Sequence, residues 1–220
     1  MNFLAHLFLG PKEPEQALGS LLGDFVRGPV ECLDLPQGVR DGIWLHRRID
    51  VFTDAHPLVR RSRERVSPER RRYAGIMIDM FYDHLLARHW QAFSDQPLEQ
   101  FTQDIYAVLL DQQSIIPEQA WPTISRMAKN DWLSSYARLH HLHRALDNIS
   151  LRLKRANPLP GSAQELEQDY LGFEADFMAY MPQVIAYATD QAADFNRSTA
   201  VPVASSELSS APESGVNPKA

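Results

Sequence analysis

Histidine and aspartate side chains in apolar surroundings mark the first ninety residues of the chain. They are His6, Asp24, His46, Asp50, Asp54, Asp79, Asp83 and His84. Imidazole nitrogens and carboxylate oxygens can ligate a divalent cation that activates water and neutralises phosphate charge. His46 and Asp50 lie four residues apart, as do Asp79 and Asp83, so each pair projects from one face of a helix. These residue types and spacings predict metal-assisted hydrolysis of a phosphoester.

Each of these residues also has a simpler interpretation when it is taken alone. His6 could be an ordinary core or surface histidine, and His46 with Asp50 could form a solvated helix contact. Asp24 could cap a helix or pair with a nearby arginine. Asp79 stands among large apolar residues, where a partly buried carboxylate needs a metal, a ligand histidine or an arginine as its partner. Taken together, the residues favour one site.

The elements that must position these residues are predicted to be helices, because apolar residues recur at spacings of three and four almost throughout. The clearest helix covers roughly 68–92, where Ser67 can cap and Pro68 suits the first helical position. Other helices are predicted over about 14–27, 38–54, 57–66, 97–113, 117–128, 131–155, 162–180 and 182–196. The pattern predicts an all-α, single-domain helical bundle.

The composition of the chain limits the function classes. Its 220 residues are 44% hydrophobic and 23% charged, with a formal net charge of −6. This offers no general basis for binding nucleic acid, because there is no excess positive charge to neutralise phosphates. No stretch approaches about 18 uninterrupted apolar residues, so no membrane span is predicted. Cys32 is the only cysteine, and we therefore expect a reducing, cytoplasmic location without a disulfide framework.

The composition changes near the C-terminus. From about Arg197 the chain is rich in serine, alanine, proline and valine, and it has no aromatic residue and no helical periodicity. Such a segment cannot bury enough apolar surface to fold. We expect a helical domain over residues 1–196 and a disordered tail without catalytic function over 197–220.

Four segments resemble bacterial acyl carrier protein phosphodiesterases. They are MNFLAHL at 1–7, GDFVRG at 23–28, GIWLHRRIDVFTD at 42–54 and DMFYDHLLARHW at 79–90. The resemblance implies a divergent relative of the HD phosphohydrolases that uses a divalent ion, typically manganese, with magnesium as the alternative. Such an enzyme removes the 4′-phosphopantetheine arm from holo acyl carrier protein by attack of water. The order Asp83-His84 departs from the His-Asp doublet that is usual in that superfamily.

Roles for the individual residues follow as hypotheses from the resemblance and the residue chemistry. The candidate metal ligands are His6, Asp24, His46, Asp83 and His84. Asp50 could be a ligand, could orient an imidazole, or could act as the base for the attacking water. Arg47 or Arg48 could contact the phosphodiester, because guanidinium groups match phosphate oxygens, or they could form surface salt bridges.

Two basic segments lie outside these motifs. Seven arginines fall between residues 60 and 72 against Glu64 and Glu69, which gives a local charge of +5. This arginine patch could be a solvated face, or it could steer the acidic carrier protein through Arg61, Arg63 and Arg65. The second segment contains Arg138, His140, His141, His143, Arg144 and Asp147. We interpret it as an exposed helix face.

Two other functions remain compatible with the sequence. One is a metal-dependent phosphohydrolase that acts on a nucleotide or another small phosphoester. The other is a helical adaptor without catalytic activity, which would bind an acidic protein through the arginine patch. Metal analysis separates the adaptor from the enzymes, and the mass of a treated holo carrier protein separates the two enzymes.

Overall fold

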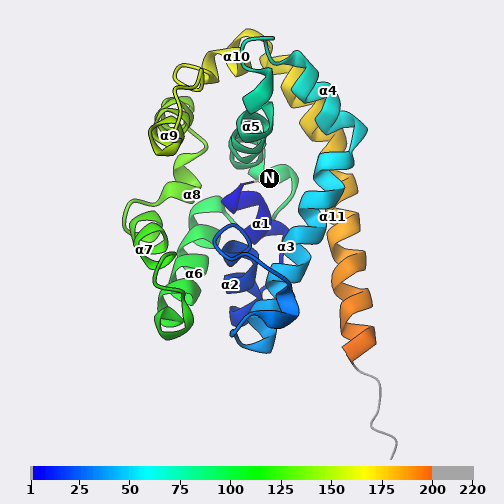
Figure 1. Ribbon diagram of the computed structural model, residues 1–220. Coiled ribbons are helices and arrows are strands. Elements are labelled where there is room, and N and C mark those ends of the chain that lie inside the picture. The colour runs from blue at the N-terminus through cyan, green and yellow to red at the C-terminus, as the bar shows by residue number, and fades with distance from the viewer. Residues whose placement is uncertain (1, 200–220) are drawn as a thin grey trace, which may run out of the picture.

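The computed structural model describes residues 2–199, with side chains described as far as residue 194. Eleven α-helices form the described part of the chain, and it contains no strand, which confirms the all-α prediction (Figure 1). They are α1 Phe3–Leu9, α2 Pro14–Leu22, α3 Gln37–Ala55, α4 Pro57–Arg65, α5 Ala74–Arg88, α6 Leu98–Asp111, α7 Trp121–Lys129, α8 Trp132–Ser135, α9 Leu139–Arg152, α10 Ala163–Gln168 and α11 Tyr170–Thr199. Short 3-10 turns cover Val30–Cys32, Arg71–Tyr73, Trp90–Ala92 and Gln113–Ile115.

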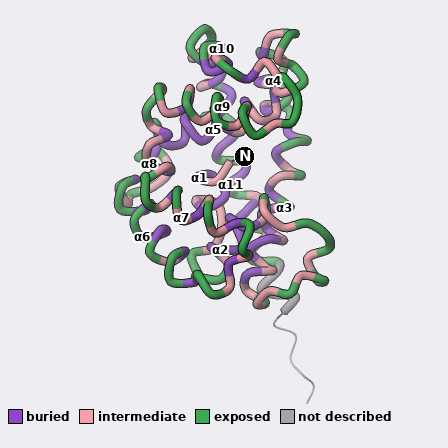
Figure 2. Tube along the Cα trace, turned by 60° about the vertical axis from the view of Figure 1, so that its left-hand side comes forward, coloured by how far each residue is buried: buried purple, intermediate pink, exposed green. Residues whose placement is uncertain are grey.

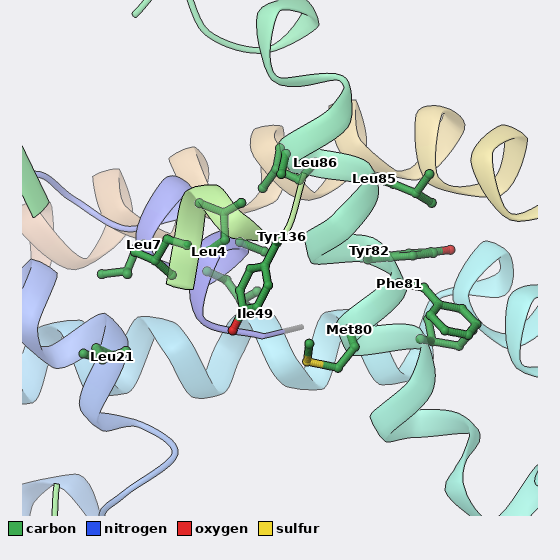
Figure 3. Packing of buried hydrophobic residues seen from close by; sticks show 14 of the residues in the cluster. Leu4, Leu7, Leu21, Ile49, Met80, Phe81, Tyr82, Leu85, Leu86 and Tyr136 are labelled. Carbon is green, nitrogen blue, oxygen red and sulfur yellow. The ribbon is translucent and has the colours of Figure 1, made fainter. Parts of the chain in front are cut away.

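Helix α5 is the central element of the bundle. Every residue from Met80 to Ala87 is buried, so this part of the helix is covered on all sides. Helices α1, α9 and α11 pack against it, and the burial colouring shows buried segments inside a mostly exposed outer layer (Figure 2). In the close view of the core, Leu4 of α1 and Met80 of α5 lie on either side of the Tyr136 ring (Figure 3). Helix α1 is therefore anchored to the centre of the molecule.

Helices α2 and α3 cross at very close range, and two glycines make this crossing feasible. A Cβ atom on Gly19 would collide with the backbone carbonyl of Val39, and one on Gly42 would collide with the carbonyl of Gln16. The two helix backbones therefore touch where other residues would hold them apart. This crossing fixes the end of α2, and the loop that follows it, against the middle of α3.

The N-terminal helices differ in extent from the prediction. Helix α1 was not predicted, because its seven residues are too few to show a clear period. The helix predicted over 68–92 is shorter and runs from Ala74 to Arg88. Ser67 does not cap it, since its hydroxyl and its backbone N–H both donate to Glu165, at 2.6 and 2.9 Å.

The C-terminal helices also differ from the prediction. The stretch 131–155 is divided into α8 and α9, and Asp131 before α8 has a left-handed φ of 44°. The two helices predicted over 162–196 are instead α10 and one long α11, which contains Pro182. Residues 197–199 belong to α11, so the predicted tail does not begin at 197. The rest of that predicted tail, 200–220, lies outside the described residues. No helix in the described part of the chain is long and apolar enough to cross a membrane.

Candidate functional site

Three of the predicted residues, one from α1 and two from α3, bring their side chains together. His6 lies in the middle of α1, and His46 and Asp50 lie on successive turns of α3. The Asp50 carboxylate bridges the Nε2 atoms of the two imidazoles, with one oxygen 3.1 Å from His6 Nε2 and the other 3.2 Å from His46 Nε2. The two rings stack with their centroids 3.7 Å apart. One ligand atom from each residue lies within 4.8 Å of the others, which is a spacing suited to a metal ion.

Solvent reaches this centre from the side of Asp50. The His6 and His46 side chains are 1% and 2% exposed, whereas Asp50 is 40% exposed. A substrate or a water molecule therefore approaches the carboxylate first, while the imidazoles form the protected floor. We call His6, His46 and Asp50 the His–Asp centre.

Main-chain groups hold the His46 ring in one orientation. Its Nδ1 lies 2.8 Å from the carbonyl oxygen of Ser20. A carbonyl oxygen only accepts, so Nδ1 carries the proton and Nε2 presents its lone pair towards Asp50 in the neutral ring. Gly23 leaves room for this ring, because a Cβ atom there would collide with the imidazole. The α2–α3 crossing thus fixes the direction of one ligand nitrogen.

The His6 ring is buried without any hydrogen bond at either nitrogen. Its Nε2 is close enough to Asp50 for an ion pair, but the contact is not aligned as a hydrogen bond. A buried polar group without a hydrogen bond costs about 1–3 kcal/mol, so native proteins rarely contain one without a reason. Coordination of a cation at Nε2 would satisfy that nitrogen.

The two imidazoles have opposite pKa shifts. Burial and the neighbouring charge of His46 lower the pKa of His6 to about 4. Burial also opposes a charge on His46, but the carboxylates of Asp24 and Asp50 overcome it and raise the pKa of His46 to about 9. For Asp50, burial disfavours ionisation, but the close contacts with the imidazoles of His46 and His6 lower its pKa below the usual range. Near pH 7, His6 is therefore neutral, which is the form that binds a metal, whereas His46 is protonated and a bound cation would displace its Nε2 proton.

Asp24 is a fourth polar group at the rim of the His–Asp centre. It follows α2, its side chain is 43% exposed, and its Oδ1 lies 3.6 Å from His46 Nε2. Arg47 holds the loop that carries Asp24, donating to the carbonyls of Val26 and Gly28 at 3.2 and 2.6 Å. The structure thus brings Asp24 to the centre and uses Arg47 to position its loop.

Arg48, the other arginine predicted to contact phosphate, faces a different element. It is exposed, its Nε donates to Gln191 of α11 at 3.0 Å, and its guanidinium carbon lies 5.7 Å from the centroid of the Trp44 ring. Two residues of a helix that are two positions apart point in nearly opposite directions, so Arg48 turns away from the face of His46. Arg48 therefore forms contacts at the surface, away from the His–Asp centre, rather than facing a phosphate there.

The predicted ligand pair Asp83 and His84 does not join the centre. Both Asp83 oxygens accept main-chain N–H groups at the start of α1, from Leu4 at 2.9 Å and Ala5 at 3.1 Å. Burial raises the pKa of Asp83 to about 7. His84 Nδ1 donates to the carbonyl of Tyr136 at 2.7 Å. The structure therefore places Asp83 and His84 outside the His–Asp centre, and Asp83 fixes the helix that carries His6.

Asp79 lies one turn before Asp83 and faces the same region. Burial raises its pKa, and the negative charge of Asp50 adds to the rise. The interaction between the two carboxyls places Asp79 in the electrostatic surroundings of the His–Asp centre. It is outside the group of three ligand atoms that lie within 4.8 Å of one another.

The arginine patch is largely neutralised by carboxylates from elsewhere in the chain. Arg61 and Arg65 bind Asp176, and Arg65 also binds Asp169. Arg63 pairs with Asp54 at 2.5 Å, and Arg70 pairs with Glu165 at 2.9 Å. These four carboxylates reduce the local charge from +5 to +1. The three arginines predicted to bind a partner all take part in these ion pairs.

Some residues that shape the centre were missed by sequence reasoning. Ser20 acts through its carbonyl oxygen, which every residue type possesses, so nothing in its identity indicates this role. Gly23 and Gly42 act through the absence of a side chain. The only signal was the position of Gly23 directly before Asp24.

The chain is similar to proteins of one family along most of its length. A family model described as "Acyl carrier protein phosphodiesterase" matches residues 1–184. A protein of that name from Serratia proteamaculans is 37% identical over 192 residues, covering 87% of this chain and 99% of the relative. The one from Pectobacterium atrosepticum is 36% identical over 197 residues, with the same coverage. A relative from Escherichia coli O157:H7, also 36% identical, is covered completely. No solved structure matches the chain.

Proposed function

The chain belongs to the acyl carrier protein phosphodiesterase family and is a phosphodiesterase, and we propose that its reaction takes place at the His–Asp centre. The substrate is holo acyl carrier protein, and the bond cleaved joins 4′-phosphopantetheine to the carrier serine. The observation that carries this proposal is the buried His6 ring, whose nitrogens lack hydrogen bonds beside the Asp50 carboxylate.

We assign a divalent cation to the centre, with manganese as the first candidate and magnesium as the alternative. Its ligands would be His6, His46 and Asp50, whose nitrogen and oxygen donors suit such ions. The cation would supply charge to neutralise the phosphodiester and lower the pKa of a bound water. The Ser20 carbonyl supports the assignment, because metal-binding histidines usually donate their second ring N–H in this way.

Asp24 is the candidate for handling the proton of the attacking water. It is exposed at the rim, and its carboxylate lies 3.6 Å from His46 Nε2 without belonging to the group of three ligands. The water oxygen bonds to phosphorus while the bond from phosphorus to the serine oxygen breaks. One proton of the water passes to Asp24 and then to solvent, and the serine oxygen takes a proton from solvent. The products are apo carrier protein and 4′-phosphopantetheine.

The test is to incubate holo carrier protein with the purified enzyme and Mn²⁺ and to weigh the carrier by mass spectrometry. We expect loss of the whole 4′-phosphopantetheine group, and no loss with Asp50→Asn or after removal of metal by a chelator. Metal analysis of the purified protein should find a divalent ion in the wild type and less in the variant.

Other outcomes would overturn the proposal. A carrier of unchanged mass, together with hydrolysis of nucleotides, would identify a phosphohydrolase of small esters. Tight binding of the carrier without any hydrolysis or metal would identify an adaptor. Full activity in the presence of a chelator would contradict the assignment of a metal but not the assignment of the reaction.

We also propose that the arginine patch docks the carrier protein, although internal ion pairs reduce its local charge to +1. Arg61 is 54% exposed although it binds Asp176, so its outer face is accessible to an acidic partner. Charge reversal at Arg61, Arg63 or Arg65 would break internal ion pairs as well, so it cannot isolate docking. Arg60, which is exposed, offers the cleaner variant: Arg60→Glu should weaken carrier binding more at low salt than at high salt.

A further inference from the structure

A pocket of about 510 Å³ lies between the start of α1 and the helices α8 and α9. Its apolar wall includes Phe3, Met80, Trp132 and Ile149. The volume falls within the range of pockets that bind drug-sized molecules, roughly 300–1,000 Å³. We call it the α1–α9 pocket.

Helix α1 carries residues of both the α1–α9 pocket and the His–Asp centre, since Phe3 lines the pocket and His6 belongs to the centre. The Phe3 ring lines the pocket and stacks on Phe25, with ring centroids 6.0 Å apart and an angle of 11° between the planes. Phe25 directly follows Asp24 at the rim of the centre. His6 is one helical turn beyond Phe3, which corresponds to about 5 Å along the axis of α1. The pocket and the centre are therefore lined by residues on successive turns of α1.

The polar lining of the pocket consists of donors and amides. Arg144, Arg152 and His141 supply N–H groups, and Asn130 and Asn148 supply amides that can both donate and accept. None of the lining residues carries a carboxylate. Two of them, His141 and Arg144, belong to the second basic segment, which the sequence indicated as an exposed helix face. The structure therefore gives that segment a concave surface beside the candidate active site.

A second pocket provides a contrast. A cavity of about 430 Å³ between α2, α3 and α11 is lined by Glu13 and Asp41 and by no arginine, lysine or histidine. An anionic or carbonyl-rich ligand would be disfavoured there. The cationic character is thus specific to the α1–α9 pocket among these two cavities in the described part of the molecule.

We propose that the α1–α9 pocket binds the pantetheine arm of the carrier protein while the arm's phosphate lies at the His–Asp centre. This inference rests on the proposed function. The arm is a linear chain with two amide groups, a hydroxyl and a geminal dimethyl group. Its carbonyl oxygens would accept from Arg144, Arg152 or Asn148, and its methyl groups would pack against Trp132 and Phe3. A pocket with apolar walls and a few donors selects such a chain over a simple phosphodiester.

The first experiment fills the pocket and compares matched variants. Ile149→Trp narrows the pocket, whereas Leu151→Trp places the same side chain two residues away on the same helix, where Leu151 is 83% exposed. For each protein, kcat/KM is measured on holo carrier and on bis(4-nitrophenyl) phosphate, which has no arm. We expect the ratio of the two to fall roughly tenfold or more in Ile149→Trp and to stay unchanged in Leu151→Trp.

A second pair of variants, at polar residues, keeps the test valid if Ile149→Trp fails to fold. Arg144→Ala removes a donor from the pocket, and Arg138→Ala removes an exposed arginine that does not line it. The ratio should fall in the first and not in the second. Equal ratios in wild type, Ile149→Trp and Arg144→Ala would overturn the inference, even though the wild type released apo carrier as proposed.

Binding of the arm alone separates this inference from the proposed function. Isothermal titration of the wild type and Ile149→Trp with pantetheine, and with AMP as a comparison, needs no turnover. Pantetheine should bind the wild type and lose affinity in Ile149→Trp. If pantetheine bound in this way but holo carrier were not hydrolysed, the pocket assignment would stand and the proposed reaction would fall. Binding of AMP without binding of pantetheine would overturn the pocket assignment.

Discussion

Two clusters of charged side chains in this molecule are built alike and satisfied differently. In one, Asp50 lies between His6 and His46; in the other, Asp176 of α11 lies between Arg61 and Arg65 of α4. Asp176 is fully buried, and it accepts from Arg61 Nε at 2.6 Å, Arg65 Nε at 2.9 Å and the Ser62 hydroxyl at 3.0 Å. The His–Asp centre is open at Asp50 and has a buried ring without hydrogen bonds.

The difference indicates a division of tasks between the clusters. A buried carboxylate with several aligned donors joins two helices and has little capacity left for a ligand. A centre that leaves ligand atoms unsatisfied gains from binding something else. We therefore expect variants of the Asp176 cluster to change stability and variants of the His–Asp centre to change activity.

The largest expected effect is on turnover at the His–Asp centre. Asp50→Asn keeps the shape of the side chain and removes its charge, and we expect kcat on holo carrier to fall by about 10²- to 10³-fold. Asp54→Asn, one helical turn further along α3, is the matched control and should change kcat little. A variant Asp50→Asn that kept full turnover and metal content would contradict the assignment of the centre.

The next effect is on stability at the other cluster. Asp176→Asn leaves two guanidinium groups without their shared carboxylate, and we expect the free energy of unfolding to fall by about 3 kcal/mol. For a chain of this size that corresponds to a decrease in Tm of roughly 6–12 °C. Asp169→Asn removes a half-exposed partner of Arg65 and should cost less than about 1 kcal/mol. If Asp176→Asn lost kcat at a temperature at which the variant is fully folded, the division between a stabilising cluster and a reactive centre would be wrong.

Asp83 belongs to neither cluster but acts on the first through α1. Asp83→Asn replaces one of the two oxygens that accept from Leu4 and Ala5 by an amide donor, so the start of α1 should loosen at a cost of about 1–2 kcal/mol. Because His6 is part of α1, kcat should fall by about tenfold and metal affinity should weaken. Chemical denaturation and metal titration of the variant measure both effects. Unchanged metal affinity would show that α1 is held by its other contacts.

The smallest expected effect is on the pH dependence of stability. Burial disfavours the charged form of Glu165, but hydrogen bonds from Ser67 and Arg70 outweigh it and lower the pKa of this carboxyl below its usual value. A lowered folded-state pKa contributes stability that is present above the unfolded pKa and is lost as the pH falls through the folded one. Thermal unfolding of Glu165→Gln should therefore lose less stability than the wild type between about pH 5 and pH 3. A steeper loss in the variant would contradict this sign.

The sequence predicted the helical class and part of the centre for physical reasons that the structure makes clear. Apolar periodicity reports which face of a helix is buried, and the spacing of His46 and Asp50 places both side chains on one face. Asp83 could not be interpreted in the same way, because a carboxylate that accepts main-chain N–H groups has the same local sequence as one that binds metal. The partner of Arg61 lies 115 residues away, and no local pattern encodes such a distance.

The glycines at the α2–α3 crossing have a consequence for anyone who would rebuild this chemistry in another helical scaffold. Copying the histidines and aspartates onto two helices at an ordinary spacing would leave the Ser20 carbonyl too far from the imidazole to orient it. The transferable unit is the backbone contact at Gly19 and Gly42, together with the gap at Gly23 into which the ring fits. In this protein the orientation of His46 depends partly on three positions that have no side chain, Gly19, Gly23 and Gly42.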